Sequence, residues 1–221
     1  MNKMSKTMKA QSGFTLIEIA IVLVIIGLLL GGVLQGQQLI ENSRVRAAVN
    51  DFKGIPAATY SYMDRYKRLP GDDLGATAAL RGTAWTGQTA GDADGTVDSV
   101  AFAATLFTTG PTLEQLYYWQ HLRASGFIPG DATATGVSSL PQNPFGGLTA
   151  VTSIAAFALP AGQNKVCMNN VPGSAASALD TTLDDGDPVT GSFRANLTAV
   201  ATVPTVTGYD ETALHFVCLR M

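Results

Sequence analysis

Residues 13–34 read GFTLIEIAIVLVIIGLLLGGVL and decide how the N-terminal part of the chain folds. From Phe14 to Leu34 there are 21 residues with a single charge, Glu18. As an α-helix this segment spans about 30 Å, the thickness of the hydrocarbon core of a bilayer. Residues 1–13 carry three lysines and no acid. Because basic flanks stay on the cytoplasmic side, we expect the remainder of the chain to be exported.

A secretory signal peptide is the main alternative for this N-terminus, but its pattern is different. Signal peptides have a shorter apolar region, which is followed by small residues at the cleavage site. The apolar run here is too long, and residues 31–33 match such a site poorly. The small residue stands before the run instead, at Gly13. Cleavage after Gly13 would remove the basic leader and keep the hydrophobic helix.

Glu18 is the unusual residue of the apolar segment. A carboxylate in a membrane helix costs about 2.5–3.5 kcal/mol at the bilayer centre and is usually functional. One interpretation is that Glu18 reaches the interface and favours the positive end of the helix dipole. The other starts from cleavage after Gly13, which creates an α-amine on Phe14. In a bundle of helices this cation neutralises Glu18 of a neighbouring copy and sets the axial register, since an unpaired buried charge is costly.

Gly13, Phe14 and Glu18, followed by the aliphatic run, resemble the class III signal of type IV pilins and type II secretion pseudopilins. The resemblance covers about residues 9–35. It implies cleavage between Gly13 and Phe14 by a prepilin peptidase, N-methylation of Phe14, and a role for Glu18 in assembly. The implied partners are other pilin subunits, an inner-membrane assembly platform and, before assembly, the lipid of the bacterial inner membrane. The implied location of the head is the periplasm, and then an extracellular pilus or a periplasmic pseudopilus.

The apolar helix is expected to continue beyond the membrane segment. Apolar residues recur near the helical period after residue 34; they include Val45, Val49, Phe52, Ile55, Tyr60 and Met63. Pro70–Gly71 predicts an end near residues 66–69. The whole helix would have about 53 residues and a length of about 80 Å.

The fold class expected is therefore α+β and pilin-like, with a long N-terminal helix packed on a small antiparallel sheet. We divide the chain into a leader (1–13), a transmembrane or filament-core helix (14–34), an amphipathic continuation (35–66) and a globular periplasmic head (67–221). Residues 70–110 are expected to be mostly loop. A helix is predicted over residues 112–125, and strands over 151–159, 165–169, 191–197 and 213–220.

The two cysteines, Cys167 and Cys218, lie late in the chain and form no CxxC pair. In an exported head the natural prediction is one disulfide, worth about 2–4 kcal/mol. Two buried free thiols are the alternative. By resemblance to pilins, a bridge here would bound a D-region-like segment, residues 168–217.

Residues 91–98, GDADGTVD, resemble the first half of a calcium loop. Alternate carboxylates in a glycine turn can direct oxygens at one hard cation, which makes Asp92, Asp94 and Asp98 candidate calcium ligands. The match is partial, because no Glu follows at the expected distance. A solvated Asp/Gly turn is the alternative, and residues 184–187 form a second acidic cluster that turn chemistry explains.

No catalytic motif of a known kind occurs in the sequence, so we do not expect an enzyme. Beyond the leader the chain has 11 bases and 17 acids, a balance that gives no clear nucleic-acid site. The first hypothesis is a structural subunit of a type IV pilus or pilus-like filament. A secretion pseudopilin is the nearest alternative. A single-pass anchored periplasmic binding module that never polymerises is a more remote one.

Overall fold

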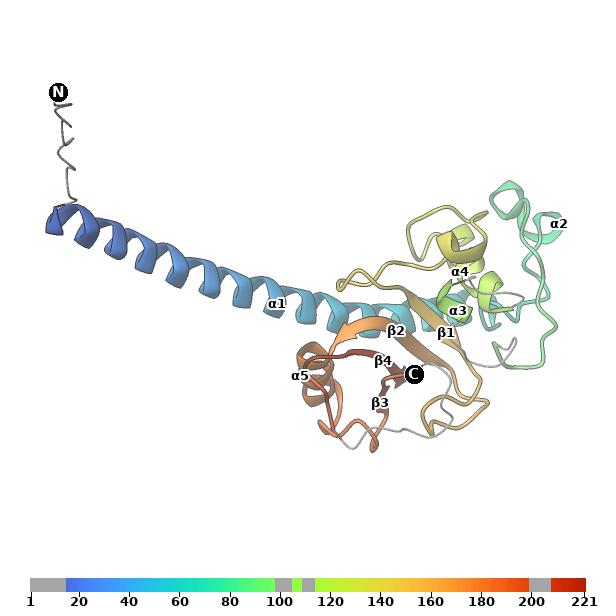
Figure 1. The fold of residues 1–221 in the computed structure, drawn as a ribbon. Coiled ribbons are helices and arrows are strands. Elements are labelled where there is room, and N and C mark those ends of the chain that lie inside the picture. The colour runs from blue at the N-terminus through green and yellow to red at the C-terminus, as the bar shows by residue number, and fades with distance from the viewer. Residues whose placement is uncertain (1–14, 98–104, 109–113, 199–207) are drawn as a thin grey trace, which may run out of the picture. The chain divides into compact units, whose positions relative to one another are not determined.

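The computed structural model describes residues 15–97, 105–108, 114–198 and 208–221. The chain forms two compact units, Met1–Asn42 and Ser43–Met221. Helix α1, Leu16–Tyr66, begins in the first unit and ends in the second (Figure 1). The predicted long helix is confirmed, with 51 residues and an end at Tyr66. Pro56 lies inside α1 without ending it.

The second unit, Ser43–Met221, is called the head from here on, and the part of α1 within it buries one face. Val49, Phe52 and Ile55 are buried as predicted. The apolar stripe expected from the sequence is wrong for the last two turns, where Tyr60 is 57% and Met63 is 38% exposed. Thr59 and Tyr62 are buried in their place, because their hydroxyl groups find hydrogen-bond partners inside the head. Thr59 is hydrogen-bonded to the hydroxyl of Tyr118, and Tyr62 donates to Asp73.

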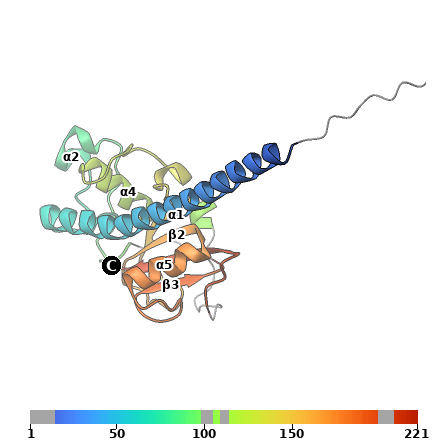
Figure 2. The same ribbon diagram turned by 90° about the vertical axis from the view of Figure 1, so that its left-hand side faces the viewer.

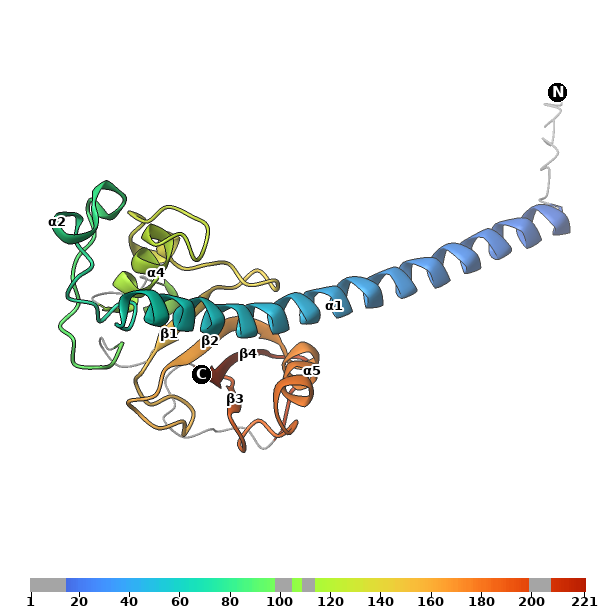
Figure 3. The ribbon, with the colours of Figure 1, turned by 180° about the vertical axis from the view of Figure 1, so that it is seen from behind.

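A four-stranded antiparallel sheet forms the second layer of the head, in the order β1-β2-β4-β3. Its strands are β1 Thr149–Thr152, β2 Lys165–Pro172, β3 Phe193–Asn196 and β4 Leu214–Arg220. Seen from behind, the second half of α1 lies over β1 and β2 (Figure 3). Phe52 of α1 packs edge-on against Phe193 of β3, with ring centroids 5.7 Å apart. The α+β, pilin-like layout expected from the sequence is confirmed.

The strand predicted over residues 151–159 is wrong beyond Thr152. Phe157 and Ala158 adopt positive φ angles of 49° and 63°, which a strand does not allow. Ala156, Phe157 and Leu159 are nevertheless buried. This apolar run is therefore a turn that inserts into the core, and the sequence pattern detected its burial but not its conformation.

The helices of the head surround this sheet. Helix α4, Glu114–Ala124, confirms the helix predicted over 112–125; Thr112 lies outside the described residues. Helix α5, Gly173–Leu183, follows directly after β2, packs on β2, β3 and β4, and was not predicted (Figure 2). Four shorter helices complete the described part: α2 Ala78–Arg81, η1 Thr83–Trp85, α3 Thr105–Thr108 and η2 Gly136–Ser139.

Candidate functional site

Thr15 and Glu18 form a reciprocal cap at the start of α1. The backbone N–H and the hydroxyl of Thr15 donate to Glu18 Oε2 at 2.8 Å and 2.7 Å. The N–H of Glu18 donates to Thr15 Oγ1 at 3.3 Å. This is a capping box, in which the N-cap residue and the third helical residue satisfy each other's backbone donors. This cap was not predicted from the sequence, although the Thr-x-x-Glu spacing at 15–18 was a sufficient signal.

The cap fixes the position of the Glu18 carboxylate and leaves one of its two oxygens available to another partner. Both bonds from Thr15 end on Oε2, and Oε1 accepts no hydrogen bond from the residues that the structure describes. The carboxylate is thus held beside the positive end of the helix dipole, with one oxygen open to a further cation. The expected cleavage residues, Gly13 and Phe14, lie outside the described residues.

Beyond this cap, α1 presents apolar side chains to its surroundings on every side. Leu16 is 93% exposed and Leu28 is 74% exposed, and the most apolar stretch of the helix has no buried residue. Within the described part of the chain, α1 is the one helix that is long and apolar enough to cross a membrane. A helix that is hydrophobic all round requires lipid or other protein around it.

Residues 8–34 match the family model described as the prokaryotic N-terminal methylation motif. The chain therefore carries the class III signal of type IV pilins and pseudopilins, as its residues suggested. The motif implies processing by a prepilin peptidase and assembly with other pilin-like subunits, and the apolar helix suggests anchoring in a membrane. No curated protein matches the chain.

Cys167 and Cys218 are joined by a disulfide, as predicted. They lie directly opposite each other on β2 and β4, and both are fully buried. The bridge therefore links the two central strands of the sheet, and the segment between the cysteines contains α5 and β3. Two free thiols, the alternative left open by the sequence, are excluded.

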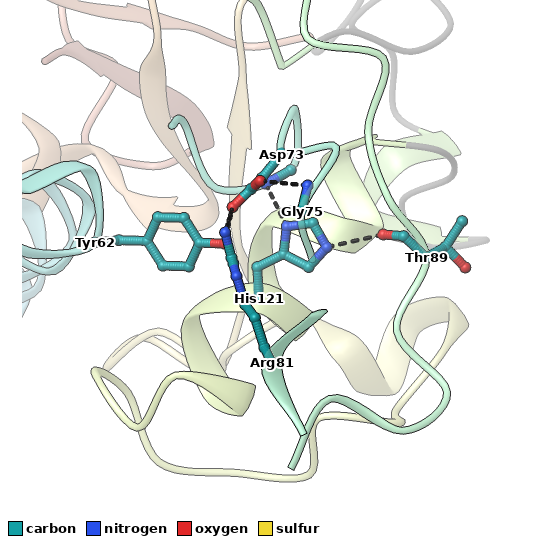
Figure 4. A network of polar contacts seen from close by, with 7 residues as sticks. Tyr62, Asp73, Gly75, Arg81, Thr89 and His121 are labelled. Carbon is teal, nitrogen blue, oxygen red and sulfur yellow. Dashed lines mark hydrogen bonds and ion pairs between the residues drawn. The ribbon is translucent and has the colours of Figure 1, made fainter. Parts of the chain in front are cut away.

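An ion pair between Asp73 and Arg81, in the segment that follows α1, is connected to α1 through Tyr62 (Figure 4). Arg81 donates to Asp73 Oδ2 at 2.6 Å and to the hydroxyl of Tyr62 at 2.9 Å. Tyr62 in turn donates to Asp73 at 2.7 Å. Burial raises the pKa of Tyr62 strongly, so it stays neutral and acts as a donor. The Arg81 guanidinium also lies 4.0 Å from the ring centroid of Tyr66, so its charge is satisfied on more than one side.

His121 extends this polar region as a structural residue (Figure 4). Its Nδ1 accepts a bond from the Gly71 N–H at 3.0 Å, and its Nε2 lies 2.9 Å from the Thr89 carbonyl, to which it donates. Both bonds together require the neutral imidazole. Burial lowers the pKa of His121 to about 4, in agreement with that state.

The predicted calcium residues belong to a larger group of acids. Asp92 and Asp94 lie together with Asp72 and Glu114, and one carboxylate oxygen of each lies within 4.8 Å of those of the others. Asp98 lies outside the described residues. Asp72 and Glu114 were not predicted from the sequence, because they stand about 20 residues away on either side.

The second acidic cluster differs in part from the prediction: Asp184 and Asp185 lie together with the buried Asp180, which was not predicted, and Asp187 does not belong to the group. Asp184 Oδ2 accepts hydrogen bonds from the backbone of Ser192 and Phe193. These bonds anchor the turn that leads into β3, which agrees with the turn chemistry inferred from the sequence. The hydroxyl of Tyr209 donates a hydrogen bond to Oδ2 of the buried Asp180 at 2.6 Å.

Proposed function

We propose that this chain is a structural subunit of a type IV pilus or pilus-like filament. In this proposal a prepilin peptidase cuts it between Gly13 and Phe14, and the mature subunit assembles through α1. The observation that carries the proposal is the matched motif over residues 8–34, with Glu18 held at the start of an exposed apolar helix.

The processed end supplies the partner that Glu18 lacks. Cleavage after Gly13 gives Phe14 a cationic α-amine. In a filament core, Oε1 of Glu18 accepts this amine from a neighbouring subunit, while Oε2 continues to cap its own helix. Removing one partner from such a pair leaves an uncompensated charge in an apolar core, which costs about 3–5 kcal/mol. A misplaced subunit meets that penalty, and the pair therefore selects one axial register.

The apolar surface of α1 provides the interface for assembly. Burying one large aliphatic side chain is worth about 1.5–3 kcal/mol relative to water, but lipid already provides this burial before assembly, so close packing between helices supplies the driving force. The glycines of this segment support helix–helix contact as well. Gly27 and Gly31, like Gly32 and Gly36, are spaced by four residues, and a Cβ on any of them would meet nothing within 4 Å in the chain. Small residues at this spacing let membrane helices approach closely.

Two substitutions at the cap distinguish the effect of the Glu18 charge from the effect of helix capping. Glu18→Gln removes the charge but keeps a side chain that completes a capping box, whereas Thr15→Ala removes the cap and keeps the charge. We expect Glu18→Gln to insert in the membrane normally and to reduce sheared filaments at least about tenfold, since 1.4 kcal/mol already corresponds to tenfold. Thr15→Ala should retain most assembly, because a lost cap costs only about 1 kcal/mol.

Mass spectrometry of each purified chain provides the control for processing. The mature wild-type chain should begin at Phe14 with one added methyl group, and so should both variants. An uncut chain, or filaments at the wild-type level with Glu18→Gln, would contradict the proposal. If Glu18→Gln and Thr15→Ala reduced filament yield equally, helix capping alone would explain the role of Glu18. Filaments confined to the periplasm would identify a secretion pseudopilin, and a membrane-bound chain with an intact leader that never polymerises would identify an anchored binding module.

A further inference from the structure

We propose that Asp72, Asp92, Asp94 and Glu114 bind one Ca²⁺ ion in the head. One oxygen of each carboxylate lies within 4.8 Å of one oxygen of every other. Calcium binds its oxygen ligands at about 2.3–2.6 Å, so two ligands on opposite sides of one ion are about 5 Å apart. A single ion can therefore contact all four residues. The inference does not depend on whether the chain forms filaments.

Asp72 gives independent evidence that this cluster requires a cation. Its side chain is only 4% exposed, and Oδ1 is buried without a hydrogen-bond partner. Leaving a buried carboxylate oxygen unpaired is costly, since the group has lost its water. Among the described residues, no lysine or arginine forms an ion pair with Asp72, Asp92 or Asp94.

Backbone and hydroxyl donors already orient the four carboxylates. Glu114 Oε1 accepts the N–H of Asp92 at 3.0 Å, and Asp92 Oδ1 accepts the N–H of Asp94 at 3.1 Å. Asp94 Oδ1 accepts the N–H and the hydroxyl of Thr96, each at 2.8 Å. Asp72 Oδ2 accepts the N–H of Gly95 at 2.9 Å. One oxygen of each carboxylate is thus fixed by the protein, which preorganises the ligands as hydrogen bonds to ligating side chains do in metal sites.

Two glycines allow the three separate segments to meet. A Cβ on Gly91 would lie 2.3 Å from the carbonyl oxygen of Gly71, so the two loops touch through their backbones. Gly71 itself has a φ of +95°, and its Cβ would lie 2.7 Å from the carbonyl oxygen of Glu114. Substitution at either position would separate the ligands. The ion would therefore fasten both loops to the start of α4.

The chemistry of the donors favours calcium over other common cations. All four donors are carboxylate oxygens, and the cluster has no histidine or cysteine for zinc. Magnesium keeps several of its waters and usually takes one or two carboxylates, whereas calcium accepts six to eight oxygens. Asp92 and Asp94 are exposed, so water can complete the coordination from the open side.

The test is calcium binding by the full chain in detergent, stripped with EDTA and titrated calorimetrically with Ca²⁺ and then with Mg²⁺. The variants are the buried Asp72→Asn and the exposed Asp94→Asn. Asp131→Asn is the matched control, because Asp131 Oδ1 accepts the same pair of bonds from Thr133 that Asp94 accepts from Thr96. Asp131 lies outside the carboxylate cluster.

We expect wild type and Asp131→Asn to bind the same number of calcium ions, and each cluster variant to bind one fewer or to bind at least about tenfold more weakly. Thermal unfolding should agree, with a calcium-dependent rise in Tm that Asp94→Asn loses. If Asp72→Asn does not fold, Asp94→Asn alone decides the question. The proposal fails if wild type binds no calcium, if Asp94→Asn binds as wild type does, or if Mg²⁺ binds as tightly as Ca²⁺.

Discussion

The two units of this chain differ in the exposure of their apolar side chains. In the unit of residues 1–42, Leu23 is 64% exposed and Leu28 is 74% exposed. In the unit of residues 43–221, apolar side chains such as Phe52 are 1% exposed. The head also buries polar groups, such as Asp73 and His121, and provides most of them with hydrogen bonds inside the chain.

This difference separates stability from assembly. The head buries its own apolar groups and provides most of its buried polar groups with hydrogen bonds, so substitutions there should change the free energy of unfolding. The N-terminal unit has no internal partner for its apolar surface among the described residues, so substitutions there should change membrane anchoring or polymerisation. The chain offers a convenient reporter, because Trp85 and Trp119 are its two tryptophans and both belong to the head. Tryptophan fluorescence during denaturation therefore reports on the head alone.

The largest expected effect compares two positions of α1. Phe52→Ala would leave a cavity in the head and remove the edge contact with Phe193. We expect it to lower the free energy of unfolding by about 3–5 kcal/mol in guanidinium titrations of the full chain in detergent. Leu28→Ala removes apolar surface from an exposed position and should leave that value unchanged within about 0.5 kcal/mol. Similar losses at both positions would show that the two regions do not differ in this way.

The disulfide should give the next largest effect, again confined to the head. Cys167 and Cys218 are separated by 51 positions, and replacing both by alanine frees that loop in the unfolded state. We expect the free energy of unfolding to fall by about 2–4 kcal/mol. Reductant should lower the stability of wild type by a comparable amount once unfolding exposes the bridge, and it should leave the double variant unaffected. Loss of membrane anchoring in the double variant would contradict the separation of the two units.

The sequence predicted the elements whose signals are local. The apolar run and Pro70–Gly71 define α1, and the paired cysteines indicated the bridge between β2 and β4. Helix α5 was missed because it begins at Gly173, just after a proline, without a side-chain cap, and is rich in small residues. Its buried Ala175, Ala176 and Leu179 do follow a helical period, so a weaker signal was present.

The candidate sites were predictable only where their residues are neighbours in sequence. Gly13, Phe14 and Glu18 stand within six positions, and the methylation motif was readable directly. Asp92 and Asp94 were found for the same reason. Asp72 and Glu114 join them only because Gly71 and Gly91 let three backbones approach, and no local pattern reveals such an approach.

The smallest of these effects is a dependence of head stability on pH, which arises from His121. Burial lowers the pKa of this side chain to about 4, whereas an unfolded histidine titrates near 6.5. Below pH about 6.5, His121 therefore binds a proton in the unfolded chain but stays neutral in the folded chain. The contribution of neutral His121 to the free energy of unfolding is therefore present in full above pH about 6.5 and is lost as the pH falls towards about 4.

The measurement is the free energy of unfolding at pH 7 and pH 5, compared between wild type and His121→Gln. Wild type should lose about 2 kcal/mol more than the variant over this interval. The variant will be less stable at pH 7, because it cannot reproduce both the bond from Gly71 and the bond to Thr89. His215 also has a pKa lowered by burial, but it is present in both proteins and cancels in the comparison. Equal losses in the two proteins would mean that His121 is not held neutral, and that the buried polar groups do not make the head sensitive to acid through this residue.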